Sequence, residues 1–393
     1  MANKKIINKK KICIISFSTI GRDFRVQREI EMARTSFEVT VIGYGAWEPF
    51  DNVKYIQLSE TRRTKGYLLC LLIKLLLGYF FHDFYNAAYW GKSEYKQAVS
   101  IIKNGKFGLV HANDWAALPV AAEAAAHIKT KVLFDAHEYY PYQINQDIFS
   151  TILLKPYREY ILRKFQNVFD TMVDASTEFS RLYKENFGWD STTILNAPYY
   201  EKNTFKPVDP RQIRIIYHGL AVPNRQQEEL INMIKLADNR YHLFMMLVPG
   251  INARYYSWLK SYGQKKAPNR VTFLDPVQPE EVVETIKQFD LGIPYLKSKQ
   301  LNQFYAQQNK FFEYMMAGLG VITTPQKGLA GIINKYQVGC VAESQSAQAL
   351  ADLLNSLDDK EINMFKRNSI KAAKTFNAKN EMKKLERIYI NLT

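Results

Sequence analysis

The chain alternates short runs of β-branched and other apolar residues with amphipathic segments of helix length, and both halves show this pattern. Parallel strands need a long crossover between them, so the alternation is typical of parallel sheets covered by helices. The pattern therefore predicts two such sheets. The expected strands are 12–17, 38–43, 109–112, 131–135 and 170–175 in the first half, and 214–218, 241–248, 271–274, 291–294, 320–323 and 339–341 in the second.

Residues 196–210 separate the two sets of strands. This stretch is polar and contains three prolines, which neither a helix nor a central strand accommodates. A length of 393 residues also suits two domains. We therefore expect an α/β protein with a first Rossmann-like domain over residues 1–200 and a second over 201–372. Ligands of open parallel sheets bind beyond the carboxyl ends of the strands, so two facing sheets predict a cleft.

Charge and cysteine usage narrow the classes of partner. The formal net charge of +15 predicts attraction to a nucleic acid, an anionic bilayer or a phosphorylated substrate. The sequence has no zinc-finger spacing and no RNA-binding aromatic motif, so we expect no nucleic-acid partner. Cys13, Cys70 and Cys340 lie far apart, which indicates neither a disulfide framework nor a zinc site. No cleavable apolar region follows the lysine-rich amino terminus, and a cytoplasmic location is expected.

The most apolar segment is 67–81, which contains one charged residue, Lys74. It is shorter than the roughly 20 residues that a membrane-spanning helix needs. Arg62, Arg63 and Lys65 precede it, so one interpretation places residues 62–81 in the interface of an anionic membrane. The other interpretation is a helix packed in the core of the first domain.

In the second half, two segments can bind a phosphorylated ligand. Lys310 and Glu313 are three positions apart in a helix-like stretch, so they share one helix face. This face can hold the hydroxyls of a ribose and the charge of a diphosphate. Gly219 follows a strand and lets the backbone approach a phosphate closely, and Arg225, expected at a helix start, adds a bidentate cation.

In the first half, polar residues gather at the ends of two expected strands. One strand ends in His111, Asn113 and Asp114, and the next ends in Asp135, His137 and Glu138. Because the carboxyl ends of parallel strands share one edge of a sheet, these groups are expected in one wall of the ligand site. Gly21 alone lacks the three spaced glycines of a dinucleotide fingerprint and gives no support to a nicotinamide enzyme.

Taken together, these segments resemble the family-four retaining glycosyltransferases with the GT-B fold, of the bacterial surface-polysaccharide type. The motifs that carry the resemblance are His-Ala-Asn-Asp at 111–114, Asp-Ala-His-Glu at 135–138, Asp-x-Arg-Val-x-Arg-Glu at 23–29 and the helix and strand at 307–325. The resemblance implies two Rossmann-like domains facing across a cleft, with a C-terminal helix at 373–393 that packs back on the first domain. It also implies a metal-independent, hexosyltransferase-type enzyme.

The resemblance assigns roles to individual residues. Glu313 would grip the ribose of the nucleotide and Lys310 would face its diphosphate, while the catalytic residues would be His137 and Glu138. The complete donor-binding set is Gly219, Arg225, Asn309, Lys310, Glu313, Gly328 and Leu329, and the acceptor-binding set is Gly21, Arg25, Asn113 and Asp114. Arg25 and Arg28 have an alternative role, because they can instead pair with Asp23 and Glu29 on the helix face.

The expected reaction moves a sugar from a nucleotide-diphosphate donor, a co-substrate rather than a cofactor, to a glycan or polyprenyl-linked acceptor. Two departures from the family pattern leave alternatives open. Leu220 stands where many members have an arginine. Tyr305 stands where a second acidic residue often lies, with seven residues between it and Glu313. The alternatives are a catalytically idle subunit that binds sugar nucleotides or glycans, and a nucleotide-sugar 2-epimerase on the same fold.

Overall fold

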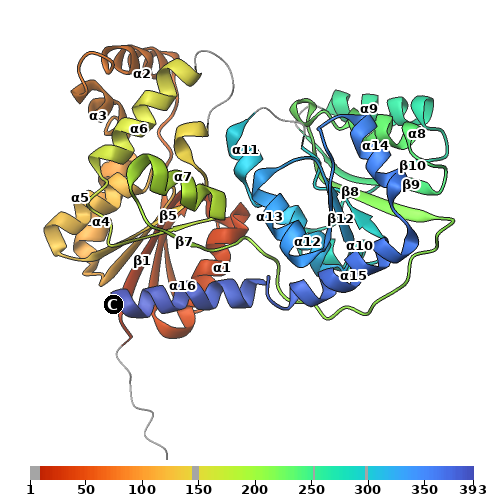
Figure 1. The fold of residues 1–393 in the computed structure, drawn as a ribbon. Helices are drawn as coiled ribbons and strands as arrows, with labels where there is room; N and C mark the ends of the chain where they lie inside the picture. Colours follow the sequence, from red (N-terminus) through yellow and green to blue (C-terminus); the bar gives the residue numbers. More distant parts are fainter. Residues whose placement is uncertain (1–8, 144–149, 251–252, 297–299) are drawn as a thin grey trace, which may run out of the picture. The chain divides into compact units, whose positions relative to one another are not determined.

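A computed structural model describes residues 9–143, 150–250, 253–296 and 300–393. The chain forms two compact units, shown in Figure 1. The N-terminal unit comprises Met1–Ile194 together with Met382–Thr393, and the C-terminal unit comprises Leu195–Glu381. The first domain was expected to end at residue 200 and the second at 372, so the structure moves both boundaries by several residues. The predicted cleft between the domains stays a prediction.

The N-terminal unit is built on a parallel sheet with the strand order β3-β2-β1-β4-β5-β6-β7 in its described part. The strands are β1 (Lys11–Thr19), β2 (Glu38–Tyr44), β3 (Val53–Leu58), β4 (Leu109–Asn113), β5 (Lys131–Ala136), β6 (Thr171–Asp174) and β7 (Thr192–Thr193). The helices are α1 (Phe24–Ser36), α2 (Lys65–Leu77), α3 (Asp83–Tyr89), α4 (Ser93–Gly105), α5 (Leu118–Ile128), α6 (Lys155–Lys164), α7 (Thr177–Phe187) and α16 (Ala378–Leu392), with short helical turns η1 (Ile20–Arg22), η2 (Tyr140–Tyr142) and η3 (Ser150–Leu154).

The C-terminal unit repeats this plan with the order β10-β9-β8-β11-β12-β13, again within its described residues. The strands are β8 (Ile213–Ala221), β9 (Tyr241–Pro249), β10 (Val271–Leu274), β11 (Leu291–Gly292), β12 (Gly320–Thr323) and β13 (Gly339–Val341). The helices are α8 (Glu228–Leu236), α9 (Ala253–Lys266), α10 (Val282–Ile286), α11 (Leu301–Tyr305), α12 (Asn309–Met316), α13 (Lys327–Tyr336), α14 (Ala347–Ser356) and α15 (Asp359–Ala373), with 3₁₀ turns η4 (Pro223–Arg225) and η5 (Pro279–Glu281).

Both sheets confirm the predicted α/β class, and each predicted strand overlaps an observed one. Every residue of β4 and of β12 is buried, because helices cover both faces of a central parallel strand. The sequence analysis missed β3 at the edge of the first sheet and the two-residue β7. In β3, buried residues stand only at the two ends, Val53 and Leu58, so this strand lacks the continuous apolar run that marked the others.

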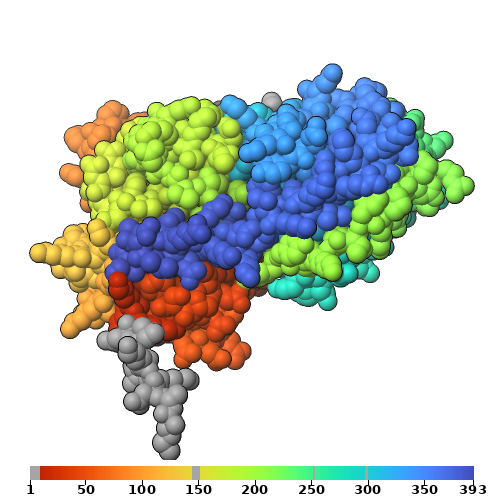
Figure 2. Space-filling model, turned by 60° about the horizontal axis from the view of Figure 1, so that its bottom comes forward, coloured from red at the N-terminus to blue at the C-terminus, as the bar shows by residue number. Residues whose placement is uncertain are grey.

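The C-terminal helix α16 carries apolar side chains that belong to the core of the N-terminal unit. Leu385 and Tyr389 are fully buried there, in one cluster with Ile12, Ile14 and Leu109. Figure 2 shows this helix, in dark blue, lying along the surface of the N-terminal unit next to the red segments. The return of the chain to its first domain therefore buries a helix face and also brings Tyr389 to the sheet.

The apolar segment 67–81 is not a core helix. Of the residues in α2, only Leu75 is buried, while Leu69 is 60% exposed and Phe80, just after the helix, is 82% exposed. The expectation of a core-packed helix is therefore wrong. None of the helices in the described ranges combines the length and the apolar character that crossing a membrane requires.

Candidate functional site

In the N-terminal unit, the predicted polar residues lie at the carboxyl ends of β4 and β5. The strand order reverses between β1 and β4, and Asn113 on β4 pairs in register with Ser16 on β1. Asn113 also pairs with Asp135 on β5. Ligands of doubly wound sheets bind where the strand order reverses. The fold therefore brings the two predicted polar strand ends together at its ligand-binding edge.

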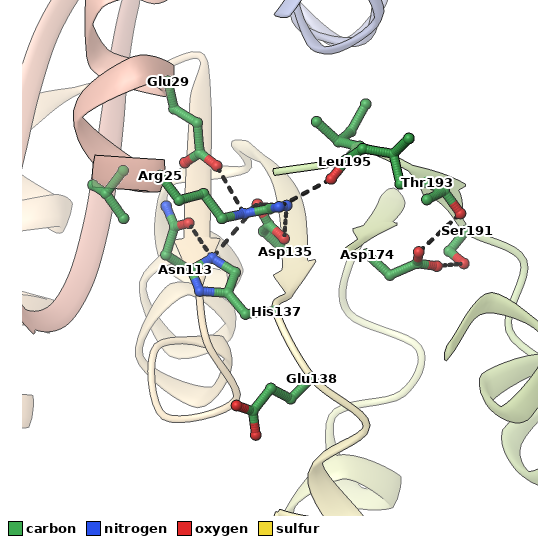
Figure 3. A network of polar contacts seen from close by, with 12 residues as sticks. Arg25, Glu29, Asn113, Asp135, His137, Glu138, Asp174, Ser191, Thr193 and Leu195 are labelled. Atoms are coloured by element: carbon green, nitrogen blue, oxygen red, sulfur yellow. Dashed lines mark hydrogen bonds and ion pairs between the residues drawn. The ribbon is translucent and has the colours of Figure 1, made fainter. Parts of the chain in front are cut away.

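Asp135 is the centre of a buried network (Figure 3). The guanidinium of Arg25, on α1, donates from Nη2 to both oxygens of Asp135, at 2.8 and 2.9 Å, and from Nη1 to the carbonyl oxygen of Ile194 at 2.9 Å. Its Nε lies 3.3 Å from Oε1 of Glu29, one helical turn further along. The contacts favour the ion-pair interpretation of Arg25 over acceptor binding, with Asp135 as an additional partner.

The two buried carboxyl groups of this network differ in protonation. Burial raises the pKa of Asp135, but the charges of Arg25 and His137 outweigh it and hold this pKa well below its usual range. Burial and the charge of Asp135 raise the pKa of Glu29 well above its usual range. Asp135 therefore holds its negative charge more readily than Glu29 does.

His111 connects this network to the C-terminal helix. Its Nδ1 lies 2.6 Å from the hydroxyl of Tyr389, and its Nε2 lies 3.6 Å from Asp135. In the described part of the chain, His111, Glu29 and Asp135 are the group whose side-chain atoms are close enough to hold a metal, within 4.8 Å of one another. The guanidinium of Arg25 already contacts both carboxyl groups. These residues therefore suit the arginine that they bind better than they suit a metal ion.

His137 lies at the exposed edge of the network, with a side chain that is 20% exposed. Its Nε2 lies 2.9 Å from Oδ1 of Asn113 and 3.7 Å from Asp135. Burial lowers the pKa of His137, but the Asp135 carboxylate more than compensates and raises it to about 9. His137 is therefore a charged hydrogen-bond donor at neutral pH and does not act as a general base in this state.

The remaining predicted residues of the N-terminal unit surround this network. Glu138 points away from Asp135 in Figure 3, and burial followed by the charge of Asp114 raises the pKa of Glu138. Asp114 has a left-handed backbone with φ of 79° and donates its N–H to the carbonyl of Asp135. Gly21 is exposed in η1, where an added Cβ would lie 3.3 Å from a backbone oxygen.

Asp174, at the end of β6, was not predicted. It accepts hydrogen bonds from Thr193, Ser191 and the backbone N–H of Ser176, and burial raises its pKa to about 6. The signal available in the sequence was the same as for Asp135, an acidic residue at the end of an apolar run. Its partners hold the chain around β7 in place, which indicates a structural role.

In the C-terminal unit, Lys310 and Gly219 are in direct contact. The backbone of Gly219 has φ of +134°, and a Cβ placed there would lie 2.3 Å from Nζ of Lys310. Glycine is therefore required both by the backbone conformation and by the lysine that packs on it. The same Cβ position lies 3.5 Å from Nη1 of Arg225, so two cations meet at Gly219. This glycine was expected to follow the strand but lies within β8, paired with Leu247.

The segment that follows β8 also differs from its prediction. Arg225 is the last residue of η4, and α8 begins only at Glu228. The expectation that Arg225 stands at the start of a helix is therefore wrong. The physical reason is Gln226, whose left-handed φ of 48° interrupts the chain between the two helical segments.

Among the residues that the structure describes, no ion pair joins Lys310 or Arg225 to a carboxylate, and the nearby Glu313 pairs with His218. Burial and the charge of Arg225 lower the pKa of Lys310, while Tyr217 and Glu313 act in the opposite direction. The ammonium of Lys310 lies 4.5 Å from the centre of the Tyr217 ring. The hydroxyl of Tyr217 accepts a hydrogen bond from the buried Gln227. This arrangement holds two positive charges close together on a support of neutral groups, which is the condition for binding an anion.

Glu313 lies on α12 next to the lysine, as predicted. Its side chain is 24% exposed, and its Oε2 lies 3.2 Å from Nε2 of His218. Burial lowers the pKa of His218, so at neutral pH a neutral imidazole lies beside the carboxylate. His218 and Tyr217 were not predicted, although both stand directly before Gly219 in the sequence.

The start of α13 lies against the end of α11, and a hydrogen bond from Gln308 to Gln326 joins the residues that precede α12 and α13. A Cβ on Gly328 would lie 2.5 Å from the carbonyl oxygens of Tyr305 and Ala306, so only glycine allows this approach. Gln326 is buried and donates to the carbonyl of Pro294 at 2.9 Å. Asn309 is exposed at the first position of α12, and the N–H of Leu329 donates to the carbonyl of Gln326.

Comparison with known proteins identifies the family of the second unit. Residues 212–359 match the family model described as group 1 glycosyl transferases. The second unit is therefore similar to group 1 glycosyl transferases over these residues. A search of curated protein sequences finds no relative that matches.

Solved structures resemble this chain over nearly its whole length. A glycosyltransferase from Rickettsia africae matches with a TM-score of 0.69 at 14% identity, covering 98% of this chain and 99% of that one. Sucrose-phosphate synthase from Thermosynechococcus elongatus matches with a TM-score of 0.70 at 15% identity, covering 98% and 99%. HepE from Anabaena, in complex with UDP and glucose, matches with a TM-score of 0.69 at 14% identity, covering 97% and 100%. These likenesses establish the GT-B fold.

Proposed function

We propose that this protein is a retaining, metal-independent hexosyltransferase that moves a sugar from a nucleotide-diphosphate donor to a glycan or polyprenyl-linked acceptor. The observation that carries the proposal is the pair of cations, Lys310 and Arg225, held against Gly219 in a domain of the glycosyltransferase family. HepE, which has the same fold, was crystallised with UDP-glucose. The setting we propose is bacterial surface-polysaccharide synthesis on the cytoplasmic side of the membrane.

The donor site supports departure of a diphosphate. When the sugar–phosphate bond breaks, negative charge develops on the phosphate oxygens, and fixed cations stabilise it because they need no reorganisation. Lys310 and Arg225 supply two such charges, and the backbone at Gly219 lets the phosphate approach. Helix starts at Asn309 and at Gly328–Leu329 add the positive ends of two helix dipoles. These groups perform the role that a metal performs in other transferases.

Glu313 supplies the ribose contact in this proposal. Its carboxylate accepts hydrogen bonds, and neutral His218 keeps it oriented at 3.2 Å. A ribose has two adjacent hydroxyl donors that match a carboxylate. The nucleotide would therefore be held at both ends, by Glu313 at the sugar and by the cations at the diphosphate.

In the N-terminal unit, His137 is the residue that we propose to act on the donor sugar. As an imidazolium it donates one N–H to Asn113 and has a second N–H at Nδ1 to donate to a sugar oxygen. Its positive charge also stabilises the negative charge that develops on the leaving group. Glu138 is the second catalytic residue of the proposal. Asp114 supplies acceptors for the hydroxyls of the acceptor glycan, together with Asn113 and the backbone at Gly21.

The test combines binding and turnover with one variant and one control. Glu313→Ala should weaken nucleotide-diphosphate binding by about 1.5–3 kcal/mol, since a charge-assisted hydrogen bond to the ribose is lost. The exposed Glu280→Ala is the matched control in the same unit. Calorimetry with UDP, GDP and ADP measures the effect, and equal affinities of the two variants would exclude the ribose assignment.

Turnover separates the proposal from the two alternatives that Leu220 and Tyr305 leave open. Radiolabelled nucleotide sugars should transfer their sugar to added glycan or polyprenyl phosphate with the anomeric configuration retained, and should do so in the presence of a chelator. A 2-epimer in the absence of acceptor would identify an epimerase. Binding without turnover of any nucleotide sugar would identify an idle subunit.

A further inference from the structure

At one end of the N-terminal unit, α2 and α3 lie side by side (Figure 1), and η3 contacts α2. The helix α2, the turn after it, the start of α3 and η3 carry an exposed apolar surface. We name it the α2–α3 surface. Leu69, Ile73, Leu76 and Phe80 follow one another at intervals of three or four residues, so they form one stripe along the helix face. The exposed apolar residues of the surface are Leu68, Leu69, Ile73, Leu76, Tyr79, Phe80, Phe81, Phe84 and Ile152.

This surface differs from ordinary exposed apolar residues. Single exposed apolar side chains are common, but a contiguous patch marks a binding surface. Phe80 and Phe81 are the extreme case, with 82% and 63% of their surface exposed. Both follow Gly78, which ends α2. The turn therefore holds two phenylalanines out toward solvent, where they gain nothing from the core of the protein.

Cations surround the apolar stripe. Arg62, Arg63 and Lys65 are exposed at the start of α2, and Arg63 lies 3.2 Å from Glu60 in a solvent-exposed pair. At the other end, Arg163 and Lys164 are exposed on α6, and Lys164 is oriented by a 2.9 Å hydrogen bond to Asn86. An apolar face bordered by cations is complementary to an anionic bilayer, which presents phosphates above an apolar interior.

A cavity of about 540 Å³ opens beside the turn that carries Phe80 and Phe81. Its wall includes three basic side chains, His82, Arg163 and Lys164, and several tyrosine rings. It also includes one carboxylate, Glu159, which lies 3.9 Å from Lys155. The size is sufficient for the head group of a lipid. Its lining residues are Tyr79, His82, Tyr85, Pro156, Glu159, Tyr160, Arg163 and Lys164.

Tyr85 gives the cavity an unused hydrogen-bond donor. The residue is 2% exposed, and its hydroxyl has no hydrogen-bond partner among the described residues. A buried hydroxyl without a partner destabilises the free protein, because its hydrogen bond to water is lost and not replaced. An oxygen of a ligand in the cavity would remove this penalty. The rings of His82 and Tyr85 are stacked with their centres 6.2 Å apart, so the histidine lies beside Tyr85 in the wall of the cavity.

We propose that the α2–α3 surface docks on an anionic lipid bilayer, with Phe80 and Phe81 inserted among the acyl chains and a lipid phosphate in the cavity beside Tyr85, His82, Arg163 and Lys164. The inference names the surface and the head-group site of the membrane contact in the proposed function. It does not depend on sugar transfer. Binding to vesicles needs no nucleotide sugar, so failure of one proposal is distinguishable from failure of the other.

Sedimentation with vesicles tests the surface. The full chain should bind vesicles of phosphatidylglycerol and phosphatidylcholine mixed in equal amounts at least tenfold more than vesicles of phosphatidylcholine alone. High salt should release part of the bound protein, since headgroup attraction is screened and apolar insertion is not. No sedimentation with the anionic vesicles, or equal sedimentation with both, would overturn the proposal.

Two variants then locate the contact. Phe80→Ser with Phe81→Ser should reduce vesicle binding at least tenfold, while Trp258→Ser, at an exposed aromatic residue of the C-terminal unit, should bind as the unaltered protein does. All these positions are exposed, so circular dichroism and the melting transition should not change. Equal binding by the double variant would exclude the α2–α3 surface.

Tyr85→Phe tests the cavity. Removing a hydroxyl that has no partner should leave the stability of the free protein unchanged or slightly raised, while binding to anionic vesicles falls severalfold. Tyr200→Phe, at an exposed tyrosine of the C-terminal unit, is the control. If Tyr85→Phe binds the vesicles as tightly as the control, the hydroxyl contacts no lipid and the head-group site is excluded.

Discussion

The two polar centres of this protein hold their charges in opposite ways. In the N-terminal unit, Arg25 is buried and bonded on both sides of the Asp135 carboxylate, which His137 also approaches. In the C-terminal unit, Lys310 and Arg225 converge on Gly219, and burial together with the charge of Arg225 lowers the pKa of Lys310. The first arrangement pairs a buried cation with a buried carboxylate of the same fold, whereas the second places two cations at one glycine.

This difference separates structural from ligand-binding charges. A charge whose partner is built into the fold contributes to stability, and its loss leaves the partner buried and unpaired. A cation without such a partner contributes to binding, because a ligand supplies the missing charge. Arg25 was expected from the sequence to bind an anionic acceptor or to form an ion pair. In the structure it binds Asp135, the carboxylate that His137 also approaches.

Asp135→Asn should have the largest effect of the substitutions that test this difference between the two centres. It should lower the free energy of unfolding by about 3–5 kcal/mol, because the buried guanidinium of Arg25 loses its anionic partner. Chemical denaturation measures the loss. Asp190→Asn, which removes the exposed pair with Lys184, should cost less than about 1 kcal/mol. Equal effects of the two changes would show that the buried network contributes no more than a surface pair.

The pH dependence of stability is the next largest effect. The pKa of His137 is about 9 in the folded protein, above the value of about 6.5 in an unfolded chain. The folded state therefore holds the proton more tightly, and this contribution is complete below pH 6.5 and lost as the pH rises through 9. Its size is on the order of 3 kcal/mol.

His137→Gln isolates this contribution. The difference in unfolding free energy between the original protein and this variant should shrink as the pH increases from 6.5 to 9.5. Titration of the imidazole by NMR gives the pKa directly. A midpoint near 6.5 would contradict the assignment of His137 as a charged donor, and it would restore the histidine as a candidate general base.

Lys310→Met tests the opposite centre and should separate binding from stability. The affinity for a nucleotide diphosphate should fall by about 1.5–3 kcal/mol, since a charge-assisted contact is lost. The stability of the free protein should stay within about 1 kcal/mol or rise, because a buried cation near Arg225 is removed. Lys335→Met, at an exposed lysine of α13, should change neither. A large loss of stability in Lys310→Met would mean that the cation is structural after all.

The smallest effect is expected for Tyr389→Phe. The variant removes the 2.6 Å hydrogen bond between Tyr389 and His111 and should cost about 1–2 kcal/mol in stability. Tyr200→Phe serves again as the control. A stability loss without any change in nucleotide binding would confirm that the network with α16 belongs to the scaffold, and reduced nucleotide affinity would contradict that division.

The sequence by itself determined the two parallel sheets, because buried strands need continuous apolar runs and parallel pairing needs helix-length crossovers. It also placed Asp135, His137, Gly219 and Lys310 at strand or helix ends, since these positions follow from the local pattern. It could not reveal β3, whose buried residues stand only at its two ends, nor the break at Gln226 that separates η4 from α8.

Only the tertiary structure decided what each charged group contacts. Arg25 and Asp135 are separated by 110 positions, and Tyr389 meets His111 across 278 positions, so no local pattern reports these pairs. The sequence could not predict the exposure of Phe80 either, because an apolar segment has the same composition whether it packs in a core or faces solvent. Local periodicity fixes which elements form, whereas the pairing and burial of a side chain depend on elements that are distant in the sequence.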